Sequence, residues 1–259
     1  MIDINIIRGY FPPLVRGNAT FNKHILKEYL QLMILDFISA SAYAKKITFI
    51  GGTNLRLILG IDRFSEDLDF DCKNMTEEEF IAMTDDVLSF LRANDFNVEP
   101  RDKANPKLTA FRRNIYFPNL LFELNLTGHK EERFLIKMEA HQGVAYTPAM
   151  ADVKGCGFFF PFQIPPKTVL CAMKLSALVS RAKGRDFYDS MFLLSQTEPD
   201  YEFLAARCGI KNKEELKAKV AELLLKIDLS KKAEDFKHLL FNIDNSKKIL
   251  HFAEFMAHL

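Results

Sequence analysis

The sequence predicts a mixed α/β fold in residues 1–153 and a helical domain in residues 154–259. Apolar residues at three-to-four spacing predict a long early helix, and short β-branched or alternating runs after it predict strands. A stretch punctuated by glycine and proline, GCGFFFPFQIPP from Gly155 to Pro166, separates these elements from a segment rich in lysine, glutamate and leucine. This order of features predicts an α/β part followed by a helical part.

The chain is long enough to bury a large core, because it has 259 residues, of which 48% are hydrophobic and 24 are phenylalanine. Its formal net charge of +1 gives no strong overall field for nucleic acid, so any polyanion site must be a local patch. The start, MIDINIIRGYFPP, lacks a basic segment followed by a long apolar run, so we expect no signal peptide. No window reaches about 18 uninterrupted apolar residues, so we expect no membrane span.

The four cysteines favour a reducing compartment. Cys72, Cys156, Cys171 and Cys208 are scattered and never form a C-x-x-C pair, which argues against a zinc site and against a disulfide framework. We therefore expect the protein to be cytoplasmic.

The first elements are a helix and a strand. A helix is predicted from Asn18 to Ala42, with Asn18 or Thr20 as its cap. The run Lys46–Ile50 is β-branched and aromatic, which is typical of a buried strand. Two glycines break this strand, and Thr53–Leu59 suits a short helix.

The following elements alternate. Asp67–Asp71 alternates aspartate with an apolar residue, which is strand periodicity. Thr76 and Glu79 form a capping box that opens a helix running to about Asn94. Further strands are predicted at Phe96–Glu99, Asn114–Phe117, Leu121–Leu126 and Phe134–Ala140, the last two forming a hairpin.

Helices dominate the rest of the chain. Thr168–Arg181 and Asp186–Ser195 are predicted helices, joined by the short basic link Ala182-Lys183-Gly184. The segment from about Glu202 to Leu259 is also predicted to be helical.

Three aspartates on one strand face are the first sign of chemistry. Asp67, Asp69 and Asp71 share a face because side chains alternate along a strand. Carboxylates this close raise one another's pKa unless a cation lies between them. Mg²⁺ suits such a site, because it binds one or two carboxylates together with substrate phosphates. The alternative is an acidic, solvated face of an edge strand.

The glycine pair supplies a second sign. Gly51 and Gly52 follow a strand and precede a helix, so their backbone N–H groups can approach an anion closely, and Thr53 adds a hydroxyl. Together with the aspartates, this segment predicts a phosphate cradle beside a metal site. The alternative is an ordinary tight turn.

These residues resemble the signature of the AbiEii-type nucleotidyltransferase toxins, which belong to the DNA polymerase β-like nucleotidyltransferase superfamily. The first block is Gly51-Gly52-Thr53, then Arg56, then RFSEDLDF from Arg63 to Phe70. Two later blocks follow in the family's order, IKMEA and KLSALVSRAKGRDFYD. They carry Lys137, Glu139, Lys174, Arg181, Arg185, Asp186 and Asp189.

The resemblance implies a nucleotidyltransferase fold: a mixed β-sheet flanked by helices, with a helical C-terminal lobe that completes the active-site cleft. It implies transfer of a nucleoside monophosphate from an NTP, dependent on Mg²⁺ or Mn²⁺. Acceptors in this family include the 3′ end of tRNA. The family's enzymes are often toxins of bacterial toxin–antitoxin or abortive-infection pairs, which implies a cognate antitoxin as partner.

The resemblance also assigns roles in the α/β part. Asp67 and Asp69 match the metal-binding pair, and Glu139 is the candidate third carboxylate, which would bind metal and draw a proton from the acceptor hydroxyl. Gly51, Gly52, Thr53 and Arg56 match nucleotide-binding positions, as does Lys137, two residues before Glu139 on the same strand. An alternative for Lys137 and Glu139 is a cross-strand ion pair on a solvated face.

Roles in the helical part carry alternatives too. Lys174 and Arg181 lie on one helical face that would bind NTP phosphates, or that would simply be the polar side of an amphipathic helix. Asp186 is a candidate catalytic residue or a helix N-cap. Arg63, like Arg56, either contacts phosphates or neutralises the aspartates, and Asp189 is an i, i+4 partner for Arg185.

The predicted function is therefore Mg²⁺-dependent nucleotidyl transfer, with tRNA as the favoured acceptor. Two alternatives remain open: a non-catalytic binding module of the same fold, and a nucleotidyltransferase that modifies a protein hydroxyl or a small molecule.

Overall fold

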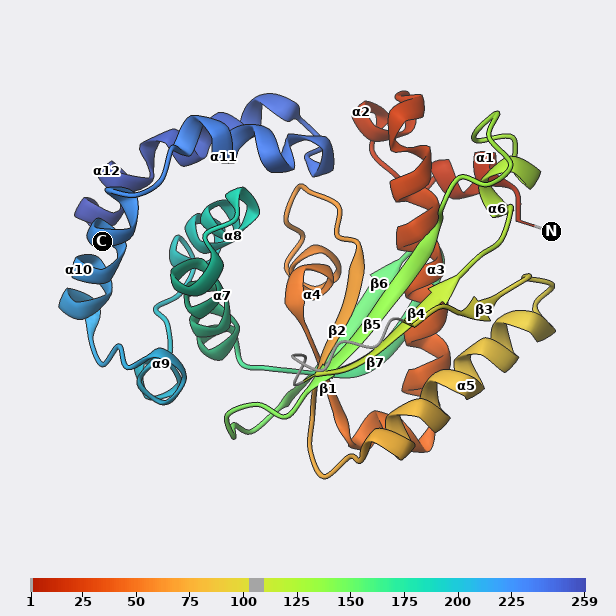
Figure 1. Ribbon diagram of the computed structural model, residues 1–259, viewed down its shortest axis with the longest axis horizontal. Helices are drawn as coiled ribbons and strands as arrows, with labels where there is room; N and C mark the ends of the chain where they lie inside the picture. Colours follow the sequence, from red (N-terminus) through yellow and green to blue (C-terminus); the bar gives the residue numbers. More distant parts are fainter. Residues whose placement is uncertain (1, 103–109) are drawn as a thin grey trace. The chain divides into compact units, whose positions relative to one another are not determined.

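The computed structural model describes residues 2–102 and 110–259, which form two compact units (Figure 1). We call the first the α/β unit; it comprises Met1–Gly60, Phe64–Gly143 and Ala149–Ile164. The second, the helical unit, comprises Ile61–Arg63, Val144–Pro148 and Pro165–Leu259. The boundary expected at residue 153 lies inside a strand of the α/β unit.

A five-stranded mixed sheet is the centre of the α/β unit. Its order is β1 (Ile47–Ile50), β2 (Asp67–Cys72), β5 (Leu135–His141), β4 (Phe111–Tyr116) and β3 (Glu99–Pro100). β2 and β5 run parallel, whereas the other neighbours are antiparallel. The predicted strands at positions 46–50, 67–71 and 134–140 are confirmed.

Helices flank this sheet. They are α1 (Ile4–Arg8), α2 (Pro13–Arg16), α3 (Asn22–Ser39), α4 (Gly51–Leu57), α5 (Glu77–Ala93) and α6 (Leu120–Glu123). Asn18 caps a 3₁₀ turn that leads into α3, and α3 runs alongside α5 (Figure 1). The capping box of Thr76 and Glu79 is confirmed at the start of α5.

The apolar face of the sheet forms the core of the α/β unit. Leu68 and Phe70, which alternate with the aspartates of β2, are fully buried. The ring of Phe70 lies 6.0 Å from that of Phe49 and 6.2 Å from that of Phe162, between ring centroids. Burial of these rings fixes the register of β2, because a slip by one residue would turn the aspartates into the core.

Two strand predictions were wrong. The segment predicted as a strand at Leu121–Leu126 contains α6 instead, because Asn119 takes a left-handed conformation (φ 59°) that turns the chain into a helix. β5 therefore pairs with β4, not with a hairpin partner at 121–126. The strand predicted at Phe96–Glu99 is reduced to the two residues of β3.

The proline- and glycine-rich connection was also predicted wrongly, because it is largely a strand. β6 (Ala149–Gly155) and β7 (Phe158–Ile164) form an antiparallel hairpin. Cys156 (φ 48°) and Gly157 (φ 86°) form its two-residue turn, and two left-handed residues match the twist of a hairpin.

The helical unit contains the helices expected from the sequence. They are α7 (Lys167–Arg181), α8 (Gly184–Leu194), α9 (Tyr201–Cys208), α10 (Lys213–Leu224), α11 (Leu229–Phe236) and α12 (Phe252–His258). No helix within residues 2–102 and 110–259 is both long enough and apolar enough to cross a bilayer.

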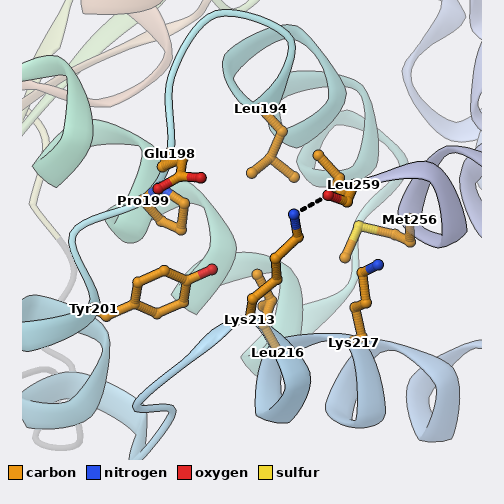
Figure 2. Close-up of a pocket in the computed structure, with 9 residues that line it drawn as sticks. All are labelled: Leu194, Glu198, Pro199, Tyr201, Lys213, Leu216, Lys217, Met256 and Leu259. Atoms are coloured by element: carbon orange, nitrogen blue, oxygen red, sulfur yellow. Dashed lines mark hydrogen bonds between the residues drawn. The ribbon is translucent and has the colours of Figure 1, made fainter.

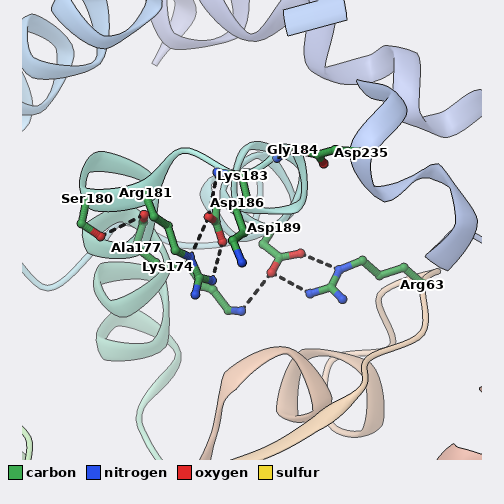
Figure 3. Close-up of polar contacts among 10 residues, drawn as sticks. All are labelled: Arg63, Lys174, Ala177, Ser180, Arg181, Lys183, Gly184, Asp186, Asp189 and Asp235. Carbon is green, nitrogen blue, oxygen red and sulfur yellow. Dashed lines mark hydrogen bonds and ion pairs between the residues drawn. The ribbon is translucent and has the colours of Figure 1, made fainter. Parts of the chain in front are cut away.

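Gly184 allows the start of α8 to approach α11 very closely. Its backbone N–H donates to Asp235 Oδ2 at 3.2 Å (Figure 3). A Cβ added to Gly184 would lie 1.9 Å from the backbone oxygen of Lys232. No side chain other than the hydrogen of glycine fits there without moving the backbone of one helix.

Gly184→Ala is therefore expected to lower the free energy of unfolding by about 3 kcal/mol, because overpacking against a backbone oxygen cannot be relieved by a rotamer change. Urea denaturation measures this loss. Gly128→Ala is the control, since a Cβ there meets nothing within 4 Å. Equal stability of the two variants would contradict the prediction.

Candidate active site

The polar face of β2 and β5 is the first part of the candidate site. The parallel register places Asp67 beside Lys137 and Asp69 beside Glu139. Residues that are paired in this way point to the same side of a sheet. The carboxylates of β2 thus face the same side as a lysine and a glutamate of β5, as the sequence predicted for each strand separately.

The start of α4 lies directly against Asp69. Gly51 has φ 84°, and a Cβ added to it would lie 2.3 Å from Asp69 Oδ2. Two side-chain bonds hold α4 here: Asn54 Nδ2 donates to Phe49 O at 2.7 Å, and the Thr53 hydroxyl donates to the carbonyl of Asp67. The predicted proximity of the glycine turn and the aspartates is therefore present.

Thr53 and Arg56 have structural partners. Thr53 is 1% exposed and its hydroxyl hydrogen bonds to β2. Arg56 forms two hydrogen bonds with Glu28 of α3, at 2.9 and 3.0 Å. The sequence predicts that Thr53 and Arg56 also contact a nucleotide. The bonds to Asp67 and Glu28 do not support this prediction, and it stays a prediction.

Cations cross-link the carboxylates of β2 and β5. Lys137 Nζ lies 3.0 Å from Asp67 Oδ2 and 3.2 Å from Glu139 Oε2. Arg112 of β4, which the sequence analysis missed, binds the other oxygen of Glu139, Oε1. The register of β4 with β5 places Arg112 directly opposite Glu139, but this pairing of distant segments has no local sequence signal.

These ion pairs keep the groups charged. Burial alone would lower the pKa of Lys137, but the carboxylates of Asp67 and Glu139 outweigh it, so that pKa is raised. Burial would likewise raise the pKa of Glu139, but Lys137 and Arg112 outweigh it and that pKa is lowered. Lys137 and Glu139 do form an ion pair, but they lie on one strand and the Glu139 side chain is 11% exposed, so this is not the expected cross-strand pair on a solvated face.

The three predicted metal ligands do not form a single cluster. Within residues 2–102 and 110–259, no group of three or more histidine, cysteine, aspartate or glutamate side chains is arranged to hold a metal ion. Glu139 is instead engaged by Arg112 and Lys137. Asp67 and Asp69 still fit Mg²⁺ or Mn²⁺, because two carboxylates suffice when substrate phosphates supply further oxygens.

α3 supports the loop that leads into β2. Gln31 Nε2 donates to the backbone oxygen of Ser65 at 3.3 Å, and Lys27 Nζ lies 3.8 Å from Glu66 Oε1. Burial lowers the pKa of Lys27, although Glu66 and Asp67 oppose this effect. The loop before Asp67 is therefore held from a helix whose residues the sequence analysis did not connect with the site.

A second group of predicted residues lies in the helical unit. Asp189 is fully buried and accepts two hydrogen bonds of 2.7 Å from Arg63 (Figure 3). Lys174 Nζ lies 2.9 Å from Asp189 Oδ2. Burial would raise the pKa of Asp189, but Arg63 and then Lys174 outweigh it and lower the pKa to about 2. The expected partner Arg185 is replaced by Arg63 and Lys174.

Arg181 and Asp186 form another pair in this unit. Arg181 donates from Nε and Nη2 to the two oxygens of Asp186, at 2.9 and 2.8 Å (Figure 3). Asp186 is fully buried and also accepts from the backbone N–H of Lys183 at 3.1 Å. Asp186 is therefore not the predicted N-cap of α8: Lys183 holds that position, and Asp186, at the third residue of the helix, accepts from the backbone of Lys183. A catalytic role for Asp186 and nucleotide binding by Lys174 and Arg181 stay predictions.

The helical unit also contains a pocket that is lined by other residues than Lys174, Arg181, Asp186 and Asp189. Figure 2 shows that Tyr201, Lys213 and Lys217 line it, and that Lys213 donates to the backbone oxygen of Leu259. None of the site residues predicted from the sequence lines this pocket.

Comparison with known proteins decides the family. The family model described as "Nucleotidyl transferase AbiEii toxin, Type IV TA system" matches residues 34–254. This chain belongs to the AbiEii family. The resemblance stated from the motifs is thereby confirmed, and the AbiEii protein described here is a nucleotidyltransferase.

Solved structures confirm the AbiEii fold. MenT4, a nucleotidyltransferase toxin from Mycobacterium tuberculosis H37Rv, is 17% identical, with 100% of this chain and 91% of that chain covered and a TM-score of 0.60. JHP933 from Helicobacter pylori is 18% identical, with 91% and 90% covered and a TM-score of 0.54. At these identities the likeness shows the fold alone. Comparison with curated proteins gives no significant match.

Family membership sets the substrate class. Nucleotidyltransferases of this kind use an NTP and, in general, a divalent metal ion. A type IV toxin–antitoxin family also implies an antitoxin partner.

Gly51→Ala is expected to lower activity at least about 100-fold, because the new methyl group would displace Asp69 and a misplacement of about 1 Å has that effect. Nucleotidyl transfer measured with the purified variant tests this. Gly60→Ala is the matched control: Gly60 has a similar φ of 73° but a Cβ there meets nothing within 4 Å. If Gly60→Ala loses as much activity as Gly51→Ala, displacement of Asp69 is not the cause of the loss.

Asp189→Asn is expected to lower the free energy of unfolding by about 3–5 kcal/mol, because it leaves Arg63 and Lys174 buried without a counter-ion. The folded-state pKa of Asp189 is depressed, so its stabilisation is present above the ordinary pKa and is lost as pH falls through about 2. Urea denaturation from pH 7 to pH 2 should show a weaker pH dependence for the variant. Asp244→Asn, at an exposed ion pair, serves as control and should unfold like the wild type.

Proposed function

We propose that this protein transfers a nucleoside monophosphate from an NTP to the 3′ end of an RNA, with tRNA as the favoured acceptor. It would do so in the bacterial cytoplasm, as the toxin of a toxin–antitoxin pair. The observation that carries the proposal is the contact between the glycine turn and the carboxylates: Gly51 touches Asp69 at the end of β1, and Asp67 lies on the same face.

The residues divide the work by position. The backbone at Gly51 and Gly52 binds the triphosphate, because a glycine turn lets N–H groups approach phosphate oxygens. Asp67 and Asp69 would hold a divalent ion, Mg²⁺ or Mn²⁺, which would supply positive charge at the reacting phosphate. Lys137 keeps the Asp67 carboxylate in place in the absence of other cations.

The reaction is a displacement at the α-phosphorus. The acceptor hydroxyl oxygen forms a new bond to that phosphorus and releases its proton to solvent water. The bond from the α-phosphorus to the oxygen that bridges to the β-phosphate breaks, and pyrophosphate leaves with that electron pair. The AbiEii membership and the intact pair Asp67 and Asp69 support catalysis over a binding module that keeps only the fold.

Incubation with each labelled NTP, Mg²⁺ and total tRNA is expected to label the RNA, and chelation by EDTA should abolish the labelling until Mg²⁺ or Mn²⁺ is restored. Asp69→Ala should lower transfer at least about 100-fold, since loss of a group that merely supports a metal ligand already costs 10–100-fold. Asp152→Ala, an exposed strand aspartate of the same unit, is the control.

Three outcomes would count against the proposal. Equal labelling by Asp69→Ala and wild type would show that Asp69 is not part of the active site. Label that appears in protein or in a small molecule, but not in RNA, would show that the acceptor is that protein or small molecule and not RNA. Tight binding of tRNA without labelling by any NTP would favour the binding module.

A further inference from the structure

Glu139 is enclosed by two cations that come from different strands. Arg112 of β4 binds Oε1 of Glu139, and Lys137 of β5 lies 3.2 Å from Oε2. Both carboxylate oxygens are therefore engaged by positive charge. A carboxylate in this position is poorly placed to accept a proton from a substrate hydroxyl, because a general base needs a free oxygen within hydrogen-bond reach of that proton.

Exposure differs between the acid and its partners. The side chain of Glu139 is 11% exposed, whereas those of Lys137 and Arg112 are 26% and 31% exposed. The carboxylate thus lies beneath two cations that reach solvent. A buried carboxylate that grips a half-exposed guanidinium fixes the direction of its remaining N–H groups.

Arg112 keeps hydrogen-bonding capacity for a ligand. Its Nε and Nη2 atoms contact Glu139, and Nη1 has no partner among the residues that the structure describes. A guanidinium held on one side presents its other edge to an anion, and its fork geometry matches a phosphate as well as a carboxylate.

The strand order places Arg112 away from the triphosphate. The sheet runs β1, β2, β5, β4, so Arg112 lies three strands from β1, which ends at Ile50 just before Gly51. Neighbouring strands are about 4.8 Å apart, which gives roughly 14 Å across this face. A triphosphate bound beside Gly51 is shorter than that. The anion that meets Arg112 therefore belongs to the other substrate, beyond the carboxylates of β2.

We propose that Arg112, oriented by Glu139, binds a phosphodiester of the RNA acceptor, and that Glu139 is a positioning residue and not a third catalytic carboxylate. The inference rests on the proposed function for the identity of the acceptor. Along this face of the sheet, the triphosphate would bind at the end of β1 and the metal ion at the carboxylates of β2. The RNA backbone would bind at β5 and β4.

The first test is binding of tRNA to the full-length protein without NTP, measured from 50 to 200 mM salt. Loss of one phosphate contact lowers the slope of log K against log salt by about one. Arg112→Ala should show this loss, and Arg112→Lys should keep the slope because the charge remains. Arg101→Ala is the control, since Arg101 is an exposed arginine of the same unit that pairs with Glu99.

The second test separates positioning from catalysis at Glu139. Glu139→Gln keeps an oxygen that accepts from Arg112, so its kcat should stay within about tenfold of wild type, whereas loss of a general base costs about 10²–10⁴-fold. Glu139→Ala should raise the KM for RNA as Arg112→Ala does, with an unchanged KM for NTP. The double variant should be no worse than either single variant, because the two residues act as one unit.

The results decide each case. An unchanged salt slope in Arg112→Ala, or a loss above 100-fold in kcat for Glu139→Gln, would overturn the inference. A wild type that binds no RNA would overturn it as well. If the wild type transfers no nucleotide, the proposed function fails, but the salt slope of Arg112→Ala still decides whether this face binds an RNA phosphate.

Discussion

The parallel pairing of β2 with β5 is the constraint on which the α/β unit depends. It brings Asp67, Asp69 and Glu139 onto one half-buried face, where like charges would repel one another. Lys137, in the same register, offsets this repulsion by lying between Asp67 and Glu139. The apolar residues on the reverse of the same strands fix the register. An acidic face and a closely packed core are thus two consequences of one strand pairing.

The glycine of the signature has a geometric reason as well as a chemical one. Gly51 is needed because its backbone takes a positive φ and because Asp69 occupies the space of a side chain. Thr53 and Asn54 then tie the same turn to the backbones of β2 and β1. These bonds leave the turn little freedom, so the backbone groups that we propose to bind the triphosphate are already ordered before it binds.

Local patterns were enough to predict the helices, the strand of alternating aspartates and the contact between that strand and the glycine turn. They were not enough for features that depend on distant partners. Arg112 lies 27 residues from Glu139, and no periodicity marks their pairing. The hairpin of β6 and β7 was missed because its glycines and prolines are typical of a connection, whereas tertiary contacts of Phe160 and Phe162 stabilise it as strands.

The ion pairs of the two units differ in what they contribute. Burying Arg63, Asp189 and Lys174 has a large desolvation penalty, so this cluster adds little net stability, although loss of one member leaves the others buried and unpaired. Arg63 follows α4 in the chain, yet this short segment belongs to the helical unit, where Asp62 also accepts from Tyr188 and Asn245. The continuous signature from Gly51 to Phe70 is therefore shared between two units. Arg63 of this signature binds the buried Asp189 of α8, and Asp67 binds Lys137 of β5.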